Sequence, residues 1–559
     1  MISRPAATLC AIAAATSFLG CAKNAREQAS FGRYHPWTVP GVLRIGSAAE
    51  PRTLNTMLDQ DSASLNIGMF VYSWAVRYDR KARPIPDALR EVPTIANGDV
   101  SKDGLTLKYK LRSNILWQDG KPLTCGDLRF TWRAVMNPHN NTVVTDGYRD
   151  IRSIECSDPH VAIIRMNRVY APFLQELFGV NGNAPILPEH LLERYNDNKG
   201  SLNTAPYNDM PIGSGPFKVV AWDRGREIRM VANRKFYLGA PKLAEVDYRY
   251  LPDPNTAELQ LIKHEVDIAG IMPQAVRRFV DLAADPRAGL TIASVDRFAW
   301  SHVDFNLKNP ILSDRNVRLA LAYATDRNDI ITKVLRGRAV PAETDQQPEL
   351  SWARTDGVEH HFYNPNKARE ILDADGWRTS PDGIRVKNGR RLEFLFTAAG
   401  TAATLAGGDG AVEVLLQREW RNVGAQADIK NFQSSVLLDP SAAGILERGR
   451  YDVAFLNSFS AADPDDSSWY SADNRAPRGQ NWMQWDNPIA TAAIRDALRT
   501  VDQARRRRDY VIVQQQLTHD VPTIILYFNR TTIAYNSDLK GFDPSSVASV
   551  FWDPWNYSI

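Results

Sequence analysis

The stretch that decides the fold spans residues 103–137 and reads DGLTLKYKLRSNILWQDGKPLTCGDLRFTWRAVMN. Apolar and polar residues alternate through 105–112, and this period of two predicts a half-buried strand. The Trp-Gln-Asp-Gly run at 117–120 predicts a tight turn, because its glycine adopts positive φ without strain. A strand followed by a tight turn is the first half of a mixed α/β unit.

A capped helix completes this unit. Thr124 and Asp127 have the spacing of a capping box, and the acidic residue also suits the positive end of the helix dipole. Side chains that we expect in the core recur at helical spacing: Leu128, Thr131, Trp132, Val135 and Met136. Asn137-Pro138 ends the helix, because the residue before a proline avoids the helical conformation.

Length and composition limit the class of protein. With 559 residues the chain exceeds the usual size of a single core, and we expect about two to four domains. Hydrophobic residues make up 44% and charged residues 23%, as in ordinary soluble proteins. A formal net charge of +3 leaves no electrostatic footprint for nucleic acid, so none is expected as a partner.

The first residues differ from the rest of the chain. Arg4 precedes an apolar segment at 6–19, which is too short for a stable membrane span. Phe18-Leu19-Gly20-Cys21 resembles a bacterial lipobox, so residues 1–21 are interpreted as a lipoprotein signal peptide with Cys21 as the lipidated residue. An ordinary secretory signal cut nearby is the alternative. The polar stretch at 22–40 is interpreted as a tether.

Two of the four cysteines lie beyond this leader, namely Cys125 and Cys156. An even number in an exported protein favours a disulfide, which would stabilise the fold by about 3–4 kcal/mol. Two separate buried thiols are the alternative. No metal site is expected, because two cysteines are too few and the one adjacent histidine pair, His360-His361, points in two directions on a strand.

Several motifs in a fixed order resemble those of the family 5 extracellular solute-binding proteins, the peptide and nickel receptors of ABC importers. The stretch 101–132 fills nearly all of that family's signature. The other matching segments are EPRTLN at 50–55, PIGSGPFKV at 211–219, NRKFYLGAPKL at 233–243, FN and SDRNVRLAL within 305–321, YNPNKA at 363–368, and VPTIILY with LKGF within 521–542. They cover the chain beyond the leader from end to end.

This resemblance implies an α/β fold with two lobes, the type II periplasmic-binding-protein architecture of the large peptide-binding cluster, with hinge crossings. By analogy the first lobe holds residues 41–300 and a C-terminal return at 530–559, and the second lobe holds 301–529. A ligand between the lobes would be hidden by hinge closure.

The family pattern also suggests where a ligand binds. In peptide-binding members an Asp receives the ligand's α-amine three residues before an acidic-Pro pair. Here that pair is Asp463-Pro464, so Ser460 stands in the place of the Asp and cannot offer an ammonium a charge-assisted bond. Alternatively the register is displaced and Asp463 itself receives the amine. If Ser460 is aligned correctly, Ser460→Asp should strengthen binding of free-amine peptides.

The residues expected to face the cleft are Glu50, Asn457, Ser458, Phe459, Ser460 and Asp463. Trp469 and Tyr470 could supply an aromatic wall, although core packing is an equal alternative.

The function that the resemblance implies is that of a substrate-binding component of an ABC importer. Such a protein captures peptides or peptide-like solutes outside the inner membrane and delivers them to permease subunits driven by a separate ATPase. We expect a periplasmic, lipid-anchored monomer without cofactor or catalytic activity. The alternatives are a non-peptide solute (a saccharide, a modified amino acid or a nickel complex), an envelope protein with a vestigial cleft, and an exported hydrolase. The one tempting nucleophile, Ser214, has no G-x-S-x-G around it.

Overall fold

The structure is a computed structural model, and it describes residues 34–59, 61–347, 350, 356–400, 409–439, 444–459, 461–465, 467–545, 547 and 549–559. The predicted signal peptide, Cys21 and Ser460 lie outside these residues. Among the described residues, no helix has the length and apolar character needed to cross a membrane.

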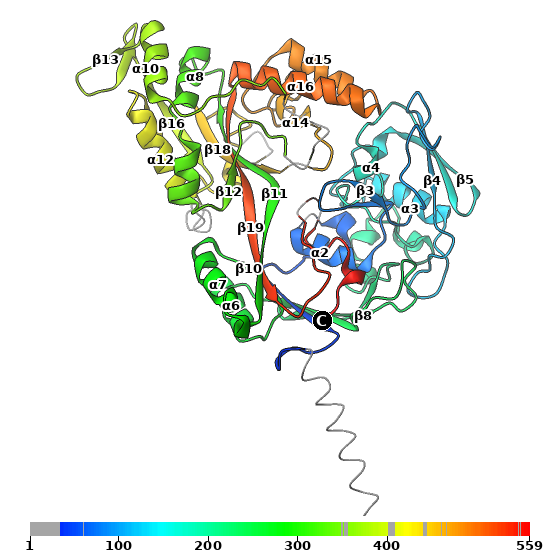
Figure 1. Ribbon diagram of the computed structural model, residues 1–559. Helices are drawn as coiled ribbons and strands as arrows, with labels where there is room; N and C mark the ends of the chain where they lie inside the picture. Colours follow the sequence, from blue (N-terminus) through cyan, green and yellow to red (C-terminus); the bar gives the residue numbers. More distant parts are fainter. Residues whose placement is uncertain are drawn as a thin grey trace, which may run out of the picture.

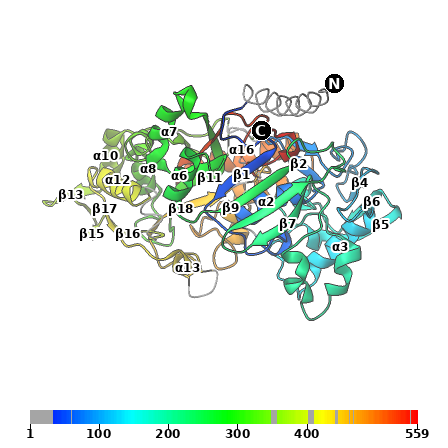
Figure 2. The same ribbon diagram turned by 90° about the horizontal axis from the view of Figure 1, so that it is seen from below.

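One mixed sheet passes through both halves of the molecule in the order β17-β16-β18-β11-β19-β10-β1-β9-β8-β7, and β12 pairs with β19. Its strands are β1 (Val42–Ser47), β7 (Phe217–Asp223), β8 (Glu227–Ala232), β9 (Glu245–Tyr250), β10 (Ile268–Ile271), β11 (Leu290–Phe305), β12 (Ala339–Pro341), β16 (Glu393–Ala398), β17 (Gln426–Ile429), β18 (Val453–Phe459) and β19 (Thr523–Asn536). Figure 2 shows β1 beside β9 at one end, and β7 beyond them at the edge of the sheet, where β8 pairs with both β9 and β7.

The two longest strands form the centre of this sheet. β11 and β19 are antiparallel and run down the middle of Figure 1, between the helices of the two halves. Their register breaks between Asp296 and Trp300, where the pairing of Asp296 with Arg530 gives way to that of Trp300 with Phe528. Such a bulge bends a strand and re-aims its side chains.

A large core organises the part that we call the first lobe. It includes Leu43, Phe70, Trp74, Tyr109, Ile164, Phe217, Val246, Phe542, Phe551 and Tyr557, so residues from both ends of the chain share it. The backbone N–H of Gly41 donates to the carbonyl oxygen of Ile559 at 2.9 Å, which closes the C-terminal return onto β1.

A second core organises the part that we call the second lobe. It includes Val303, Phe305, Leu321, Phe394, Phe396, Trp420, Phe455 and Ile524. Its helices are α8 (Arg315–Tyr323), α10 (Pro365–Ala374) and α12 (Asp409–Arg421), with α14 (Ser467–Tyr470), α15 (Pro488–Leu498) and α16 (Gln503–Asp520) around a smaller core of their own.

The signature stretch forms its own layer of the first lobe. β4 (Thr106–Lys110), β6 (Val161–Met166) and β5 (Ile151–Asp158) make a three-stranded sheet covered by α3 (Cys125–Met136). The capping box is present, since the backbone N–H of Thr124 donates to Asp127 at 2.8 Å. Met136, expected in the core, is 38% exposed, because the helix ends at that residue.

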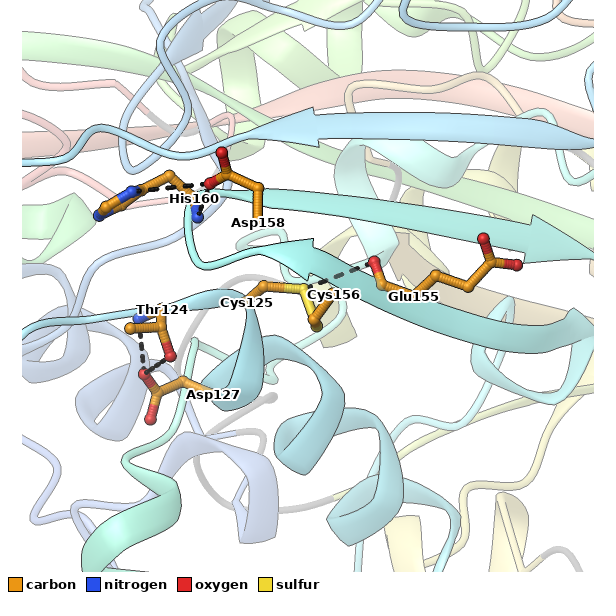
Figure 3. Close-up of a disulfide and its surroundings, with 7 residues drawn as sticks. All are labelled: Thr124, Cys125, Asp127, Glu155, Cys156, Asp158 and His160. Atoms are coloured by element: carbon orange, nitrogen blue, oxygen red, sulfur yellow. Dashed lines mark hydrogen bonds and ion pairs between the residues drawn. A yellow bond between two sulfur atoms is a disulfide. The ribbon is translucent and has the colours of Figure 1, made fainter.

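A disulfide joins Cys125, the first residue of α3, to Cys156 in β5, with Cα atoms 5.7 Å apart. This is the pairing that the sequence favoured over two separate thiols. Figure 3 shows it beside the Thr124–Asp127 cap. Because β5 is the edge strand of its sheet, the bond ties an otherwise one-sided strand to the covering helix.

The segment 34–40, expected as the end of a free tether, is instead docked on the first lobe. The side chain of Thr38 and the backbone N–H of His35 both donate to Asp538 at 2.7 Å. The indole of Trp37 stacks on the ring of His264 with centroids 3.8 Å apart. These contacts hold the chain close to the C-terminal return before β1 begins.

Candidate functional site

A hollow of about 730 Å³ lies between the two lobes, and we call it the interlobe cleft. The first lobe contributes Asp61, Leu65, Asp146, Tyr170, Pro172, Gln175, Glu176 and Asn181 among others. The strand β11, which joins the lobes, contributes Arg297 and Trp300, and the second lobe contributes Asp345, Gln346, Phe459, Asp463, Asp465 and Trp469. Several of these side chains come from α2 (Ser62–Val71), α4 (Phe173–Glu176), the bulge in β11, the end of β18, α14 and the loop before it, and the others come from connecting loops.

The central strands supply one wall of the cleft. Phe459, one of the predicted site residues, ends β18 with 63% of its surface exposed. The guanidinium of Arg297, from the β11 bulge, lies 5.4 Å from the centroid of that ring. Trp469 completes the wall and meets Trp300 edge to face at 5.9 Å, whereas Tyr470 is buried beside Trp485. The two possible aromatic residues therefore divide between wall and core.

Carboxyl groups from both lobes come together in the cleft. Burial raises the pKa of Glu176 to about 8, and repulsion from Asp146, Asp463 and Asp465 adds to the shift. Burial likewise raises the pKa of Asp465. A carboxyl group with so high a pKa is largely protonated at neutral pH, and a positively charged ligand group beside it would favour the ionised form.

Asp463 is committed to another partner. Its two carboxylate oxygens accept from both terminal nitrogens of Arg506 at 2.5 Å. Its backbone N–H donates to the side-chain oxygen of Gln175 at 2.7 Å, which links the two lobes directly. A carboxylate paired in this bidentate way is occupied, so the alternative in which Asp463 receives the ligand's amine needs Arg506 to be displaced first.

Two neighbouring predicted residues serve the sheet. The side-chain oxygen of Asn457 accepts from the hydroxyl of Ser301. The hydroxyl of Ser458 lies 2.9 Å from Nε2 of His302, whose Nδ1 lies 2.7 Å from Asp304.

The order carboxylate, imidazole, hydroxyl resembles that of a hydrolase triad. However, Ser458 and His302 are 3% exposed and Asp304 is 2% exposed, so the hydroxyl is closed to any substrate.

Glu50 is placed away from the residues that line the cleft. Its side-chain oxygen accepts from the indole N–H of Trp222 at 3.1 Å and from the backbone N–H of Gly225 at 2.9 Å. Both donors belong to the hairpin of β7 and β8. The matched segment at 50–55 therefore braces this hairpin.

Ser214 is buried within the fold, with only 1% of its surface exposed. Gly213 and Gly215, on either side of it, lie against the backbone at the end of α2. A Cβ atom added to Gly213 would lie 1.9 Å from the carbonyl oxygen of Val71, and a Cβ atom added to Gly215 would lie 2.6 Å from the same oxygen. Close backbone packing thus explains the glycine pair.

A smaller hollow of about 440 Å³ adjoins the cleft. Its lining is mostly apolar and includes Pro84, Val92, Pro93, Ile95, Ala171, Phe173, Leu174 and Val501. Pro172, Gln175 and Asp463 line both spaces, so the bond between the last two lies where the spaces meet. Among the residues that the structure describes, no group of three or more His, Cys, Asp or Glu side chains is arranged to hold a metal ion.

Residues 90–480 match the family model described as bacterial extracellular solute-binding proteins, family 5 Middle. The chain belongs to this family. The family and the two-lobed α/β fold expected from the motifs are thereby confirmed.

Relatives of known structure or name extend over nearly the whole chain. The oligopeptide-binding protein AppA of Bacillus subtilis is 25% identical over 509 residues, 90% of this chain and 89% of the relative. The structure of NikZ from Campylobacter jejuni in complex with Ni(L-His) is 27% identical, with a TM-score of 0.74 over 93% of this chain and 100% of that one. The structure of AppA with a nonapeptide shares the fold, with 24% identity and a TM-score of 0.71 over 93% and 99% of the two chains.

Proposed function

We propose that this protein is the substrate-binding component of an ABC importer and that it captures a peptide or peptide-like solute in the interlobe cleft. The observation that carries the proposal is a hollow of about 730 Å³ whose walls come from both lobes. A concave site of this size, in which apolar and aromatic side chains alternate with polar and charged ones, suits a small flexible solute that carries polar groups. The named relatives supply the class of ligand, since AppA is an oligopeptide-binding protein.

Closure of the lobes would hide the ligand and report its presence. β11 and β19 join the lobes and carry the bulge, so bending there opens or closes the cleft. The bond from Asp463 to Gln175 spans the cleft and can form only when the lobes are close. A ligand that touches both lobes binds the closed form better and shifts the population toward it. The closed form would then dock on a permease driven by a separate ATPase.

Attachment to the membrane is a further part of the proposal. Cys21 follows a lipobox-like sequence, and a lipid there would hold the protein at the cell envelope outside the inner membrane. Mass spectrometry of the N-terminal peptide from the native host tests it. A diacylglyceryl mass on Cys21 is expected, and an unmodified N-terminus at another residue would contradict it.

The central experiment combines native mass spectrometry of the protein from its own host with thermal unfolding against synthetic peptides of two to nine residues. We expect a co-purified mass that sequences as peptide. A ligand at one hundred times its Kd should add about 2.7 kcal/mol to the free energy of unfolding. A Ni(L-His) complex and a disaccharide serve as matched non-peptide solutes. Stabilisation by one of these and by no peptide would contradict the proposal.

A further inference from the structure

The bulge in β11 places one positive side chain in the wall of the cleft. Asp296 pairs with Arg530 and Trp300 with Phe528, so Arg297 lies in the segment that leaves the β19 ladder. Its side chain is exposed and is one of the groups that line the cleft. A bulge beside a binding space is a common means of turning a side chain toward it.

Among the described residues, the guanidinium of Arg297 has no anionic partner. Its neighbour Asp296 is taken by Arg530, with atoms 2.5 Å apart, and Asp463 is taken by Arg506. Within the part of the chain that the structure describes, the one contact recorded for the Arg297 guanidinium is the face of Phe459, 5.4 Å from the ring centroid. An arginine held over an aromatic ring keeps its fork of donors free for a planar anion.

The other charge-bearing side chains in the described lining of the cleft are carboxyl groups, and a positively charged ligand group beside them would favour their ionised forms. Asp146 and Glu176 come from the first lobe and Asp465 from the second, and mutual repulsion contributes to the raised pKa of Glu176. None of these carboxylates pairs with Arg297, so the positive and negative parts of the lining are separate. A ligand that satisfies both parts must carry separated charges of both signs.

We propose that Arg297 binds the carboxylate of the ligand and that the cleft therefore selects zwitterions with a free carboxylate. The guanidinium would donate two parallel bonds to the carboxylate, while the exposed ring of Phe459 packs under the adjoining hydrocarbon. The cationic group of the same ligand would lie toward Glu176 and Asp146. This inference rests on the proposed function, because it names the class of peptide-like solute that the cleft takes.

The test is isothermal titration calorimetry with paired peptides of three to nine residues, each Lys followed by alanines, as the free acid and as the C-terminal amide. We expect the free acid to bind wild-type protein at least tenfold more tightly than the amide. Arg297→Gln should remove that preference by weakening the acid alone, and Arg297→Lys should retain part of it. Arg287→Gln is the matched control, because Arg287 is an exposed arginine that pairs with Asp285 and is not one of the residues that line the cleft.

The outcomes separate the two proposals. Equal affinity of acid and amide for wild-type protein would overturn the role of Arg297 while the capture of peptides stands. An Arg297→Gln variant that weakens both peptides by the same factor would overturn it too, and thermal unfolding of the ligand-free variant checks its fold. Failure of every peptide to bind wild-type protein would overturn the proposed function and this inference with it.

Discussion

Arg297 lines the cleft and Arg506 lines the smaller hollow that adjoins it, and the surroundings of these two arginines are opposite. Arg506 is buried with Asp463, with 6% and 11% of the two side chains exposed, and makes two hydrogen bonds to it. Arg297 is exposed, stands on a bulge and contacts the face of Phe459. The first arginine has its partner within the protein, whereas the second keeps its donors for a ligand.

The difference shows that charge near a cleft does not by itself mark a binding site. Burying Arg506 removes its solvation, and the pairing with Asp463 offsets this loss. Removing either group would therefore lower the free energy of unfolding, because the other charge would be left buried without a partner. Arg297 has no paired carboxylate among the described residues, and burial lowers the pKa of its guanidinium, so a ligand carboxylate beside it would stabilise the charged form. We therefore expect the first pair to govern stability and the second residue to govern affinity.

The largest effect on stability is expected from Arg506→Met, which leaves the carboxylate of Asp463 buried without its partner. The free energy of unfolding should fall by about 3–5 kcal/mol, as for other buried pairs broken on one side. Denaturation by urea measures it.

The double variant Arg506→Met with Asp463→Leu is the control for that loss. It should recover much of the stability, because no charge is then left buried alone. A single variant that unfolds within about 0.5 kcal/mol of wild type would break the contrast between the two arginines.

The next effect concerns the acidic side of the cleft and depends on pH. The pKa of Glu176 is about 8 in the folded protein against an ordinary 4.5, so the folded state holds the proton more tightly. The tighter proton binding stabilises the folded state fully below pH 4.5, and this stabilisation is lost as the pH rises through 8. Glu176→Gln should therefore be more stable than wild type at pH 9, by about 2 kcal/mol.

Chemical denaturation between pH 5 and 9 measures this difference. Glu265→Gln, which changes an exposed carboxylate outside the cleft lining, is the matched control and should follow the wild-type profile. Parallel profiles for the Glu176 variant and wild type would show that burial and the neighbouring carboxylates do not raise the pKa of Glu176.

A smaller effect is expected at the bond between the lobes. Gln175→Ala removes the acceptor for the backbone N–H of Asp463 and should cost about 1 kcal/mol. Because that bond forms only in the closed arrangement, small-angle X-ray scattering of the ligand-free variant should report a larger radius of gyration. Gln515→Ala, whose side chain bonds within the second lobe to the carbonyl of Asp356, should leave the radius unchanged.

The smallest effect on stability is expected from the residue with the largest effect on binding. Arg297→Gln breaks no ion pair recorded among the described residues, so unfolding should change by no more than about 0.5 kcal/mol. Thermal unfolding without ligand measures it. A loss of 2 kcal/mol or more would mean that Arg297, like Arg506, serves the fold, and would end the comparison.

Local patterns made much of the architecture predictable. The alternation before Arg112, the glycine turn and the Thr124–Asp127 cap are set by neighbours in the chain, and the strand, turn and helix form where these patterns place them. The exception, Met136, is the last residue of α3, and its side chain is exposed at the end of the helix. The docked segment 34–40 was missed because its partners stand far along the chain, in the C-terminal return and at His264.

The candidate site was predicted only in part. Phe459 lines the cleft as expected, but Glu50 braces a hairpin, Ser458 lies in the sheet and Asp463 is occupied. Arg297 was missed, because the interrupted pairing of β11 with β19 is seen only in the structure. The lipidation of Cys21, the role of Ser460 and the lobe boundaries stay predictions.

The amino-acid sequence by itself determined the family, the signature unit and which segments could form a core, because periodicity, caps and turns act between residues a few positions apart. Only the tertiary structure decided which charges are free. Asp463 meets Arg506 across 43 positions, and Asp296 meets Arg530 across 234. A charged side chain is available to a ligand only when it is not already paired with such a distant residue. The site could therefore be recognised only from the folded structure.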